Sequence, residues 1–257
     1  MAIPDCYGCV CDGDIIRNRT RALSIKYFPS RQRSVTLNGV RGLNTVPNAR
    51  MDEMGTIRLG AGTSDPYLNS FLGLQILKPL YVNFRQTSEI SSLNDAPDRV
   101  YPALDFKLKL LKETAQRPAI VFGADSAIGH KRTSSEYIAF SKRKSNFDFT
   151  GGIAWGRLAG TGHIKNPLGA ISSHFDGDRD FNNENPQGLE GWFTGEEIGF
   201  FGGVEYFTPL KGLSLKADFG GNDYDIETTT NQNFNEPSPF SYGNNLIYPQ
   251  ASLVLKK

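Results

Sequence analysis

The chain has 257 residues, with 28 Lys and Arg against 27 Asp and Glu, 27 glycines, 17 Phe and 10 Tyr. This length fits one large domain or two small ones, and the balanced charge excludes a general field that would attract nucleic acid or an anionic membrane surface. No apolar run approaches the roughly 18 residues of a transmembrane helix, but membrane-spanning strands hide their apolarity by alternation.

Residues 1–34 are expected to be an unstructured leader. They contain no basic start followed by an apolar stretch, so we expect no Sec signal peptide in them. Cys6, Cys9 and Cys11 form a CxxCxC cluster, but a closed zinc site needs four ligands, and no fourth Cys or His follows nearby. We therefore predict no metal there, and we predict a single folded domain over residues 35–257.

Alternation of apolar and polar residues predicts β-strands along the rest of the chain. The clearest case is "ALDFKLKLLK" (103–112), in which Leu104, Phe106 and Leu108 alternate with Asp105 and Lys107. Its length is close to the roughly 9 to 11 residues that cross a bilayer at a tilt. The same pattern predicts strands at 57–61, 68–76, 80–85, 119–126, 135–142, 147–155, 198–207, 213–219 and 245–255.

Short and long connections alternate from Pro79 onward. In an up-and-down meander this places the short turns at one end and the long loops at the other, as in outer-membrane barrels. We therefore predict an all-β, antiparallel, up-and-down transmembrane β-barrel of about ten strands. A soluble β-sandwich, whose strands also alternate, is the alternative. The short connections are 78–79, 113–117, 143–146 and 208–212, and the long ones are 88–102, 127–134, 158–195 and 221–244.

In a barrel the polar residues of each strand face the lumen, because a charge that faces lipid costs about 2 to 4 kcal/mol near the midplane. A lumen of mixed charge with tyrosine suits a hydrated sugar polymer. The alternative is that these charges pair with one another and fill a narrow interior. The residues predicted to face the lumen and contact polysaccharide are Tyr81, Arg85, Asp105, Lys107, Lys109, Asp148, Lys216 and Asp218.

Aromatic residues gather near the predicted strand ends, where amphipathic rings would form girdles at the membrane interfaces. The alternative is that any β protein is rich in aromatic residues. The girdle candidates are Tyr67, Phe71, Tyr81, Tyr101, Tyr137, Trp155, Trp192, Tyr206, Phe207 and Tyr224.

One loop resembles a calcium-binding sequence. "DGDRDFNNENPQ" (176–187) places Asp176, Asp178 and Asp180 at alternate positions, but Phe181 and Gln187 stand where a calcium loop needs Gly and Glu. We therefore favour an acidic, solvated loop over a metal site.

Catalytic signals are few. His130, His163 and His174 lie in predicted loops, and the sequence contains no HExxH, GxSxG or P-loop motif. We expect a protein that is not an enzyme and that needs no cofactor.

Three segments resemble a known protein family in their particular residues, which is a signal separate from the alternation that predicts strands. "LNGVRGLNTVPNARMDEMGTIRLG" (37–60) contains the phrase Gly–Leu–x–x–x–Pro–x–Ala–Arg, followed by a Gly and a strand. "SSEYIAFSKRKSNFDFTGGIAWGRL" (134–158) and "GGVEYFTPLKGLSLKADFGGNDYD" (202–225) follow in order. Together they resemble the YjbH family, also called GfcD-like, of bacterial outer-membrane proteins linked to exopolysaccharide and capsule export. The phrase residues are Gly42, Leu43, Pro47, Ala49, Arg50 and Gly55.

The resemblance implies an outer-membrane barrel with turns toward the periplasm and loops toward the exterior, of which this chain covers the first part. It implies a non-enzymatic role in exopolysaccharide or capsule biosynthesis and secretion. The partners would be exopolysaccharide, other secretion proteins and outer-membrane lipid, and no nucleic acid. The alternatives are a closed barrel that anchors partner secretion proteins through its loops, a soluble β-sandwich that binds carbohydrate, and an outer-membrane enzyme that uses the loop histidines.

Overall fold

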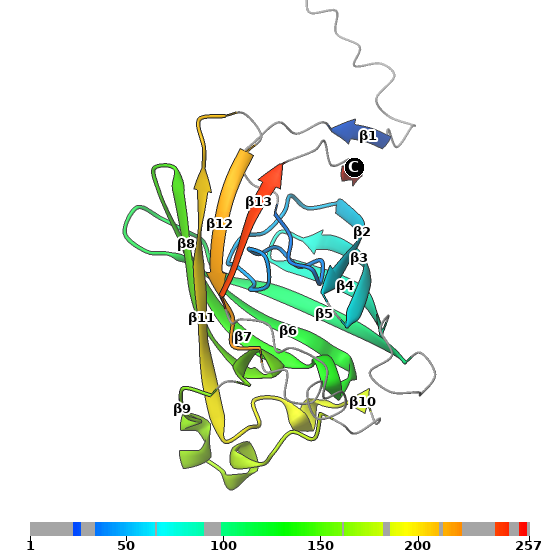
Figure 1. The fold of residues 1–257 in the computed structure, drawn as a ribbon, viewed down its shortest axis with the longest axis vertical. Helices are drawn as coiled ribbons and strands as arrows, with labels where there is room; N and C mark the ends of the chain where they lie inside the picture. Colours follow the sequence, from blue (N-terminus) through cyan, green and yellow to red (C-terminus); the bar gives the residue numbers. More distant parts are fainter. Residues whose placement is uncertain are drawn as a thin grey trace, which may run out of the picture.

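The computed structural model describes residues 23–26, 34–64, 66–89, 99–160, 162–181, 186–210, 213–222, 240–246 and 252–255. Its main feature is one curved antiparallel sheet whose long strands follow chain order (Figure 1). These strands are β2 (Thr56–Ser64), β3 (Tyr67–Leu77), β4 (Leu80–Glu89), β5 (Val100–Leu111), β6 (Ala119–His130), β7 (Ser135–Lys144), β8 (Phe147–Gly156), β11 (Glu197–Phe207), β12 (Leu213–Phe219) and β13 (Phe240–Leu246).

Four shorter strands complete the pairing. β1 (Leu23–Lys26) pairs with β14 (Ser252–Leu255), which pairs with β2, while β9 (Ile164–Lys165) pairs with β11 and β10 (Pro186–Gln187) pairs with β6. Within the described ranges β13 pairs with β12 alone, and the sheet is not closed into a barrel. The all-β, antiparallel, up-and-down prediction is thus confirmed, and closure is not seen.

Among the predicted boundaries that differ from the structure, two matter most for the fold. The single strand expected over 245–255 is two strands with different partners, β13 and β14. The loop expected over 127–134 begins late, because β6 continues to His130 after Ser126 turns the backbone to a φ of 50°. A non-glycine residue with positive φ is uncommon, and its residue type gives no signal of it.

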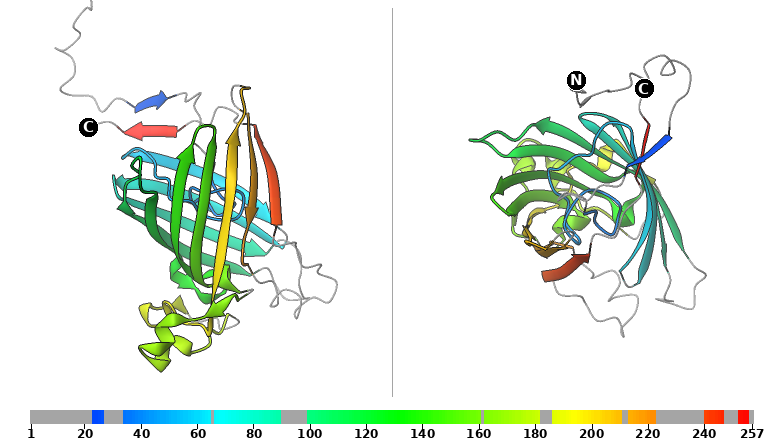
Figure 2. Two further views of the ribbon diagram at one scale, coloured as in Figure 1. Left: turned by 90° about the vertical axis from the view of Figure 1, so that its left-hand side faces the viewer. Right: turned by 90° about the horizontal axis from the view of Figure 1, so that it is seen from above.

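Residues 34–55, here called the inner segment, lie on the concave side of the sheet (Figures 1 and 2). Val46 and Leu43 are fully buried and pack with Tyr137 of β7 and Phe201 of β11 in one apolar cluster. Gly42 is needed here, because a Cβ atom would come within 2.3 Å of the Val46 carbonyl oxygen. The fold therefore places its apolar core between the inner segment and the sheet.

The long connection between β8 and β11, residues 157–196, carries the 3-10 helices η2 (Arg157–Ala159), η3 (Pro167–Ala170), η4 (Ser173–Asp176) and η5 (Leu189–Gly191), and η1 (Lys131–Thr133) lies between β6 and β7. The connection gathers at one end of the sheet, at the bottom of Figure 1. None of the helices in the described residues is long and apolar enough to cross a membrane.

Candidate functional site

The eight polar residues singled out in the sequence lie on the concave side of the sheet, facing the inner segment. Seven are buried, and Lys109 is partly exposed where the concave side opens at the end with the short turns. Asp105 is 0% exposed and Lys107 is 1% exposed. Such groups are costly to bury unless they are paired or hydrogen-bonded, so their partners decide what this surface can do.

Arg85 and Asp105 form a buried ion pair between β4 and β5. Arg85 Nε donates to Asp105 Oδ2 and Arg85 Nη2 donates to Asp105 Oδ1, both at 3.0 Å, which is the two-bond geometry of a strong arginine–carboxylate pair. Asp105 also accepts hydrogen bonds from Asn83 Nδ2 at 2.8 Å and from the Ser126 N–H at 2.7 Å. This carboxylate is fully engaged within the protein.

Lys107 and Tyr81 hold the inner segment by its backbone. Lys107 Nζ donates to the carbonyl oxygens of Arg41 at 2.9 Å and Arg50 at 3.0 Å, and Tyr81 Oη donates to the Gly39 carbonyl oxygen at 2.7 Å. Gly39 has a φ of 87°, and a Cβ there would lie 2.4 Å from the Phe71 ring, so only glycine fits. Two of the predicted lumen residues therefore contact this chain's own backbone.

Asp218 of β12 fixes the other side of the inner segment. Its Oδ2 atom accepts hydrogen bonds from three consecutive N–H groups, those of Asn44, Thr45 and Val46, at 3.1, 2.8 and 3.2 Å. Lys216, also buried, lies opposite Glu205 in the β11–β12 register. A carboxylate that accepts several backbone donors is a strong anchor, since charge-assisted hydrogen bonds exceed neutral ones.

Asp148 belongs to an ion-pair network at the end of the sheet with the short turns. Arg50 donates from Nε to Asp148 Oδ2 at 2.9 Å and from Nη2 to Oδ1 at 2.6 Å, and its Nη1 donates to Glu113. Arg143 Nη2 also donates to Asp148 Oδ2, at 3.1 Å, and the Arg143 N–H donates to Glu113 Oε1 at 2.9 Å. Arg50, a residue of the family phrase, therefore joins the inner segment to both β8 and the turn after β5.

The same network shifts the pKa of two groups. Partial burial alone would raise the pKa of Glu113, but the hydrogen bonds from Arg50 and the Arg143 N–H outweigh it and hold the pKa below the ordinary 4.5. Burial alone would lower the pKa of Arg50, yet its bonds to Asp148 and Glu113 raise it. Both shifts favour the charged forms.

The concave side carries further polar residues that the sequence interpretation missed. Asn83 and Glu205 are both buried on the concave side. Asn83 lies two residues from Arg85 and Glu205 two residues from Phe207, so the alternation of side chains along each strand could have predicted that they face inward. Asp125 follows a weak strand pattern and gave no such signal. Next to Arg85 there is also a polar cavity of about 100 Å³, lined in part by Asn69, Thr87, Asp125 and Arg132.

The opposite face of the same strands is apolar and exposed. Leu59 of β2 is 84% exposed and Phe84 of β4 is 52% exposed. Relative to a water-soluble protein the polarity of the sheet is thus inverted at these positions: charged side chains lie inside, beside the apolar core against the inner segment, and large apolar side chains lie outside. The other exposed large apolar side chains on the long strands are Leu72, Ile76, Leu77, Val100, Leu110, Leu111, Ile128, Phe140, Phe147, Phe149, Phe200 and Leu215.

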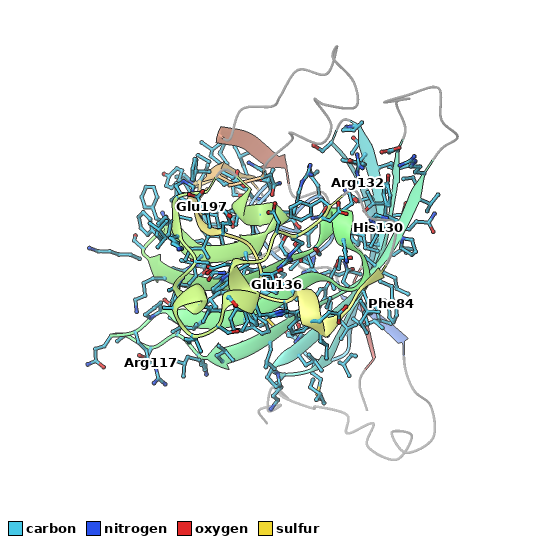
Figure 3. The ribbon with its side chains drawn as sticks, turned by 90° about the horizontal axis from the view of Figure 1, so that it is seen from below. Phe84, Arg117, His130, Arg132, Glu136 and Glu197 are labelled. Atoms are coloured by element: carbon cyan, nitrogen blue, oxygen red, sulfur yellow. The ribbon has the colours of Figure 1, made fainter. Side chains whose placement is uncertain are left out.

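Part of this outer face is covered by the connection 157–196. Trp192 stacks on Phe106 with ring centroids 5.7 Å apart, and Phe193 packs edge-on against Trp155 at 5.1 Å. Arg179 of the connection forms a buried ion pair with Glu136 of β7, with Nη2 to Oε2 at 2.7 Å, and Figure 3 labels Glu136 at this end of the sheet. Sequence patterns carry no signal of this fold-back, because it pairs residues 43 positions apart without any repeating motif.

The girdle interpretation is wrong for most of its aromatic residues. Trp155 is buried under the connection, and five others are buried against the concave side or the inner segment, so they cannot ring the outer surface. These five are Phe71, Tyr81, Tyr101, Tyr137 and Phe207. Tyr224 lies outside the described residues.

The three aspartates of the calcium-like loop do not converge. Asp176 ends η4, and Asp178 and Asp180 are exposed. Across the residues that the structure describes, no group of three or more His, Cys, Asp or Glu is placed to hold a metal ion. Cys6, Cys9 and Cys11 lie outside the described residues, as does the rest of the predicted leader apart from Ser34 and β1.

The three histidines bond locally. His130 Nδ1 accepts the Arg132 N–H at 3.1 Å and its ring lies 4.6 Å from that of Tyr101. His163 Nδ1 accepts the Phe200 N–H at 3.3 Å, and His174 Nε2 lies 2.7 Å from the Glu190 carbonyl oxygen. Each ring therefore has a backbone partner in its own neighbourhood.

Comparison with known proteins places these features in a wider group. The sequence model of the YjbH family, described as "Exopolysaccharide biosynthesis protein YbjH", matches residues 34–251. "Uncharacterized lipoprotein YjbH" of Escherichia coli (strain K12) is 34% identical over 195 residues. The alignment covers 71% of this chain and 27% of that relative, so the chain spans about a quarter of the relative's length. No solved structure matches the chain.

Proposed function

The chain belongs to the YjbH family, and from this premise we propose that it is a β-barrel component of exopolysaccharide biosynthesis and secretion in the bacterial outer membrane. In this proposal the long strands close around the inner segment, the outer face contacts lipid, and the loops reach the exterior. The chain acts without catalysis, by presenting a polar interior and its loops to the polymer and to partner secretion proteins.

The inverted polarity of the sheet carries the proposal. A soluble β-sandwich buries its apolar face between two layers, whereas here apolar side chains such as Leu59 and Phe84 are exposed and Asp105 and Lys107 are buried. Strands β2 to β8 have 9 to 12 residues, close to the roughly 9 to 11 needed to cross a bilayer. The word lipoprotein in the relative's name further supports a place in the cell envelope.

Membrane assembly tests this proposal most directly. Leu108 lies on the outer face, opposite Leu80 and Phe122 in the two neighbouring strands. The substitution Leu108→Arg should block assembly, because it places a charge against lipid, whereas Lys107→Gln keeps a donor for the inner segment and should assemble. Heat-modifiability gels of outer-membrane fractions report assembly. Equal assembly of the two variants would overturn the assigned facing.

The biosynthetic role needs a separate measurement. In a strain that lacks this chain, secreted polysaccharide should fall, and the wild type and Lys107→Gln should restore it while Leu108→Arg does not. Unchanged secretion in the deleted strain would overturn the role in secretion and leave the barrel intact.

A closed barrel that anchors partner proteins is the second candidate, and the inner segment favours it. The inner segment's backbone forms hydrogen bonds with Tyr81, Lys107 and Asp218, so these polar side chains do not face an open lumen. Single-channel conductance and polymer flux in liposomes distinguish the two candidates, since a sealed barrel passes neither ions nor polymer.

A third candidate is an outer-membrane enzyme that uses the loop histidines. Alanine substitutions at His130, His163 and His174 that leave polysaccharide output unchanged would exclude it.

A further inference from the structure

A second polar surface lies where the filled concave side opens, at the end of the sheet with the short turns. It is an open cleft of about 840 Å³ between residues 49–51 of the inner segment and the ends of the β5–β6 and β7–β8 hairpins. Figure 2 shows these hairpins projecting beyond the rest of the sheet, and Figure 3 shows Arg117 at the tip of the first. The charged residues that line the cleft are Arg50, Lys109, Lys112, Glu113, Lys142, Arg143 and Lys144.

The charge of this cleft is far from that of the whole chain. Six cationic side chains and one carboxylate line it. Asp148, which pairs with Arg50 and Arg143 from below, is a second carboxylate, so six cations against two carboxylates leave four positive charges. The entire chain has a net charge of only +1. Cationic groups are therefore concentrated here, and a cleft lined by one sign of charge concentrates ligands of the opposite sign.

Three of the six cations are already engaged. Arg50 and Arg143 bond to Asp148, and Lys142 Nζ donates to the carbonyl oxygens of Thr114 and Ala115 in the β5–β6 turn. These three side chains therefore hold the walls of the cleft together, and their bonded atoms are not available to a ligand. Even so, Arg143 Nε is a buried donor without an acceptor among the described residues.

The other three cations are Lys109, Lys112 and Lys144. Within the described ranges no carboxylate lies within ion-pair distance of any of them, and no hydrogen-bond acceptor is seen for their ammonium groups. Lys112 and Lys144 are exposed at the rim, and Lys109 lies deeper, on the concave side two residues from Lys107. All three line the same cleft, two at its rim and one deeper.

We propose that this cleft binds a segment of an acidic polysaccharide through the carboxylates of its sugar units. The inference rests on the proposed function and adds the chemical class of the polymer and its place of contact. Lysines on flexible stems are hydrated point charges, which suits weak, repeated contact with a polymer that must also leave. A lipid headgroup fits less well, because Lys109 lies on the concave side and not on the apolar outer face.

Binding to the full chain in detergent micelles tests the proposal. The probes are oligomers of galacturonic acid, neutral dextran oligomers of equal length, and phosphatidylglycerol mixed into the micelles. The cleft variant combines Lys109→Gln, Lys112→Gln and Lys144→Gln. The matched control combines Lys78→Gln, Lys131→Gln and Lys165→Gln, which removes the same charge from lysines that do not line the cleft.

Wild type should bind oligogalacturonate more weakly as salt rises, and should not bind dextran. Each exposed charge contact contributes roughly two- to five-fold in affinity, so the cleft variant should bind about ten-fold or more weakly, while the control variant stays near wild type. Equal weakening of oligogalacturonate binding in the cleft and control variants would show that binding depends on the total charge of the chain and not on the cleft. Loss of phosphatidylglycerol binding alone, with oligogalacturonate binding unchanged, would assign the cleft to lipid. Either result overturns the inference.

Heat-modifiability of the same preparations separates this failure from failure of the proposed function. If the cleft variant assembles and binds oligogalacturonate like wild type, the proposed binding site is wrong but the proposed barrel is not contradicted. A wild type that shows no heat-modifiable form contradicts the barrel, whatever the binding result.

Discussion

The concave and outer faces of the sheet come from the same strands, yet their side chains are satisfied in opposite ways. On the concave side Asp105 accepts four hydrogen bonds and Lys107 donates two, all within the protein. On the outer side Leu59 is 84% exposed and Phe84 is 52% exposed. Along the regular parts of the strands, parity decides which face a residue lies on, but a separate element, the inner segment, decides what the polar face contacts.

The largest loss of stability is expected when the most buried ion pair of the concave side, Arg85–Asp105, is removed. Asp105→Ala leaves the Arg85 guanidinium, 1% exposed, without its carboxylate. Removing one partner of a buried ion pair costs about 3 to 5 kcal/mol of unfolding free energy. Urea unfolding of the refolded chain in lipid vesicles, followed by tryptophan fluorescence, measures this loss.

Asp178→Ala is the matched control for that experiment, because Asp178 is exposed in the connection 157–196. It should change the unfolding free energy by less than about 0.5 kcal/mol. If Asp105→Ala were equally mild, the concave side would not be the rigid interior described here.

How much of this contrast the sequence predicts depends on the element. β4 and β5 alternate so regularly that residue spacing alone assigns Tyr81, Arg85, Asp105 and Lys107 to one face. The inner segment could not be assigned, since its turns at Gly39 and Gly42 depend on contacts with Phe71 and Val46. Its sequence showed a family phrase, but no period that gives a place in the fold.

The outer face was predicted less completely, for a similar reason. Exposed apolar positions such as Phe84 follow from parity, whereas the burial of Trp155 and Glu136 depends on the connection 157–196 folding back over them. A long loop with no repeating pattern carries no local signal of where it packs. The last predicted strand is likewise divided into β13 and β14 because the two parts pair with different strands, β12 and β2, which lie far apart in the sequence.

The second expected effect acts on the outer face. Phe84→Arg places a charge on the middle of β4, where contact with the hydrocarbon core would cost about 2 to 4 kcal/mol of folding free energy. Ser88→Arg is the matched control on the same face, one residue from the end of β4 at Glu89, where the cost should fall to about 0 to 1 kcal/mol.

Refolding yield into lipid vesicles, compared with solubility in the absence of detergent, measures this difference. Equal tolerance of both arginines, together with a monodisperse detergent-free protein, would show that the outer face does not contact lipid. The contrast between the two faces would then need another explanation.

The smallest expected effect concerns the pH dependence of the ion pairs where the concave side opens. Because the folded pKa of Glu113 lies below 4.5, its pairing stabilises the fold fully above that pH and is lost as the pH falls through the lower folded value. The Glu113 side chain is 23% exposed, so the loss should stay within about 1 kcal/mol of unfolding free energy.

Glu113→Gln should therefore lower the unfolding free energy at pH 7 but leave it closer to wild type at an acid pH below 4.5, as the wild-type carboxyl becomes protonated. Glu190→Gln, an exposed carboxylate in η5, should show no such convergence. A Glu113→Gln variant that differs from wild type by the same amount at both pH values would mean that the side chain acts by packing rather than by charge. The charge of the Arg50 guanidinium would then stabilise the contact between the inner segment and the sheet through Asp148 alone.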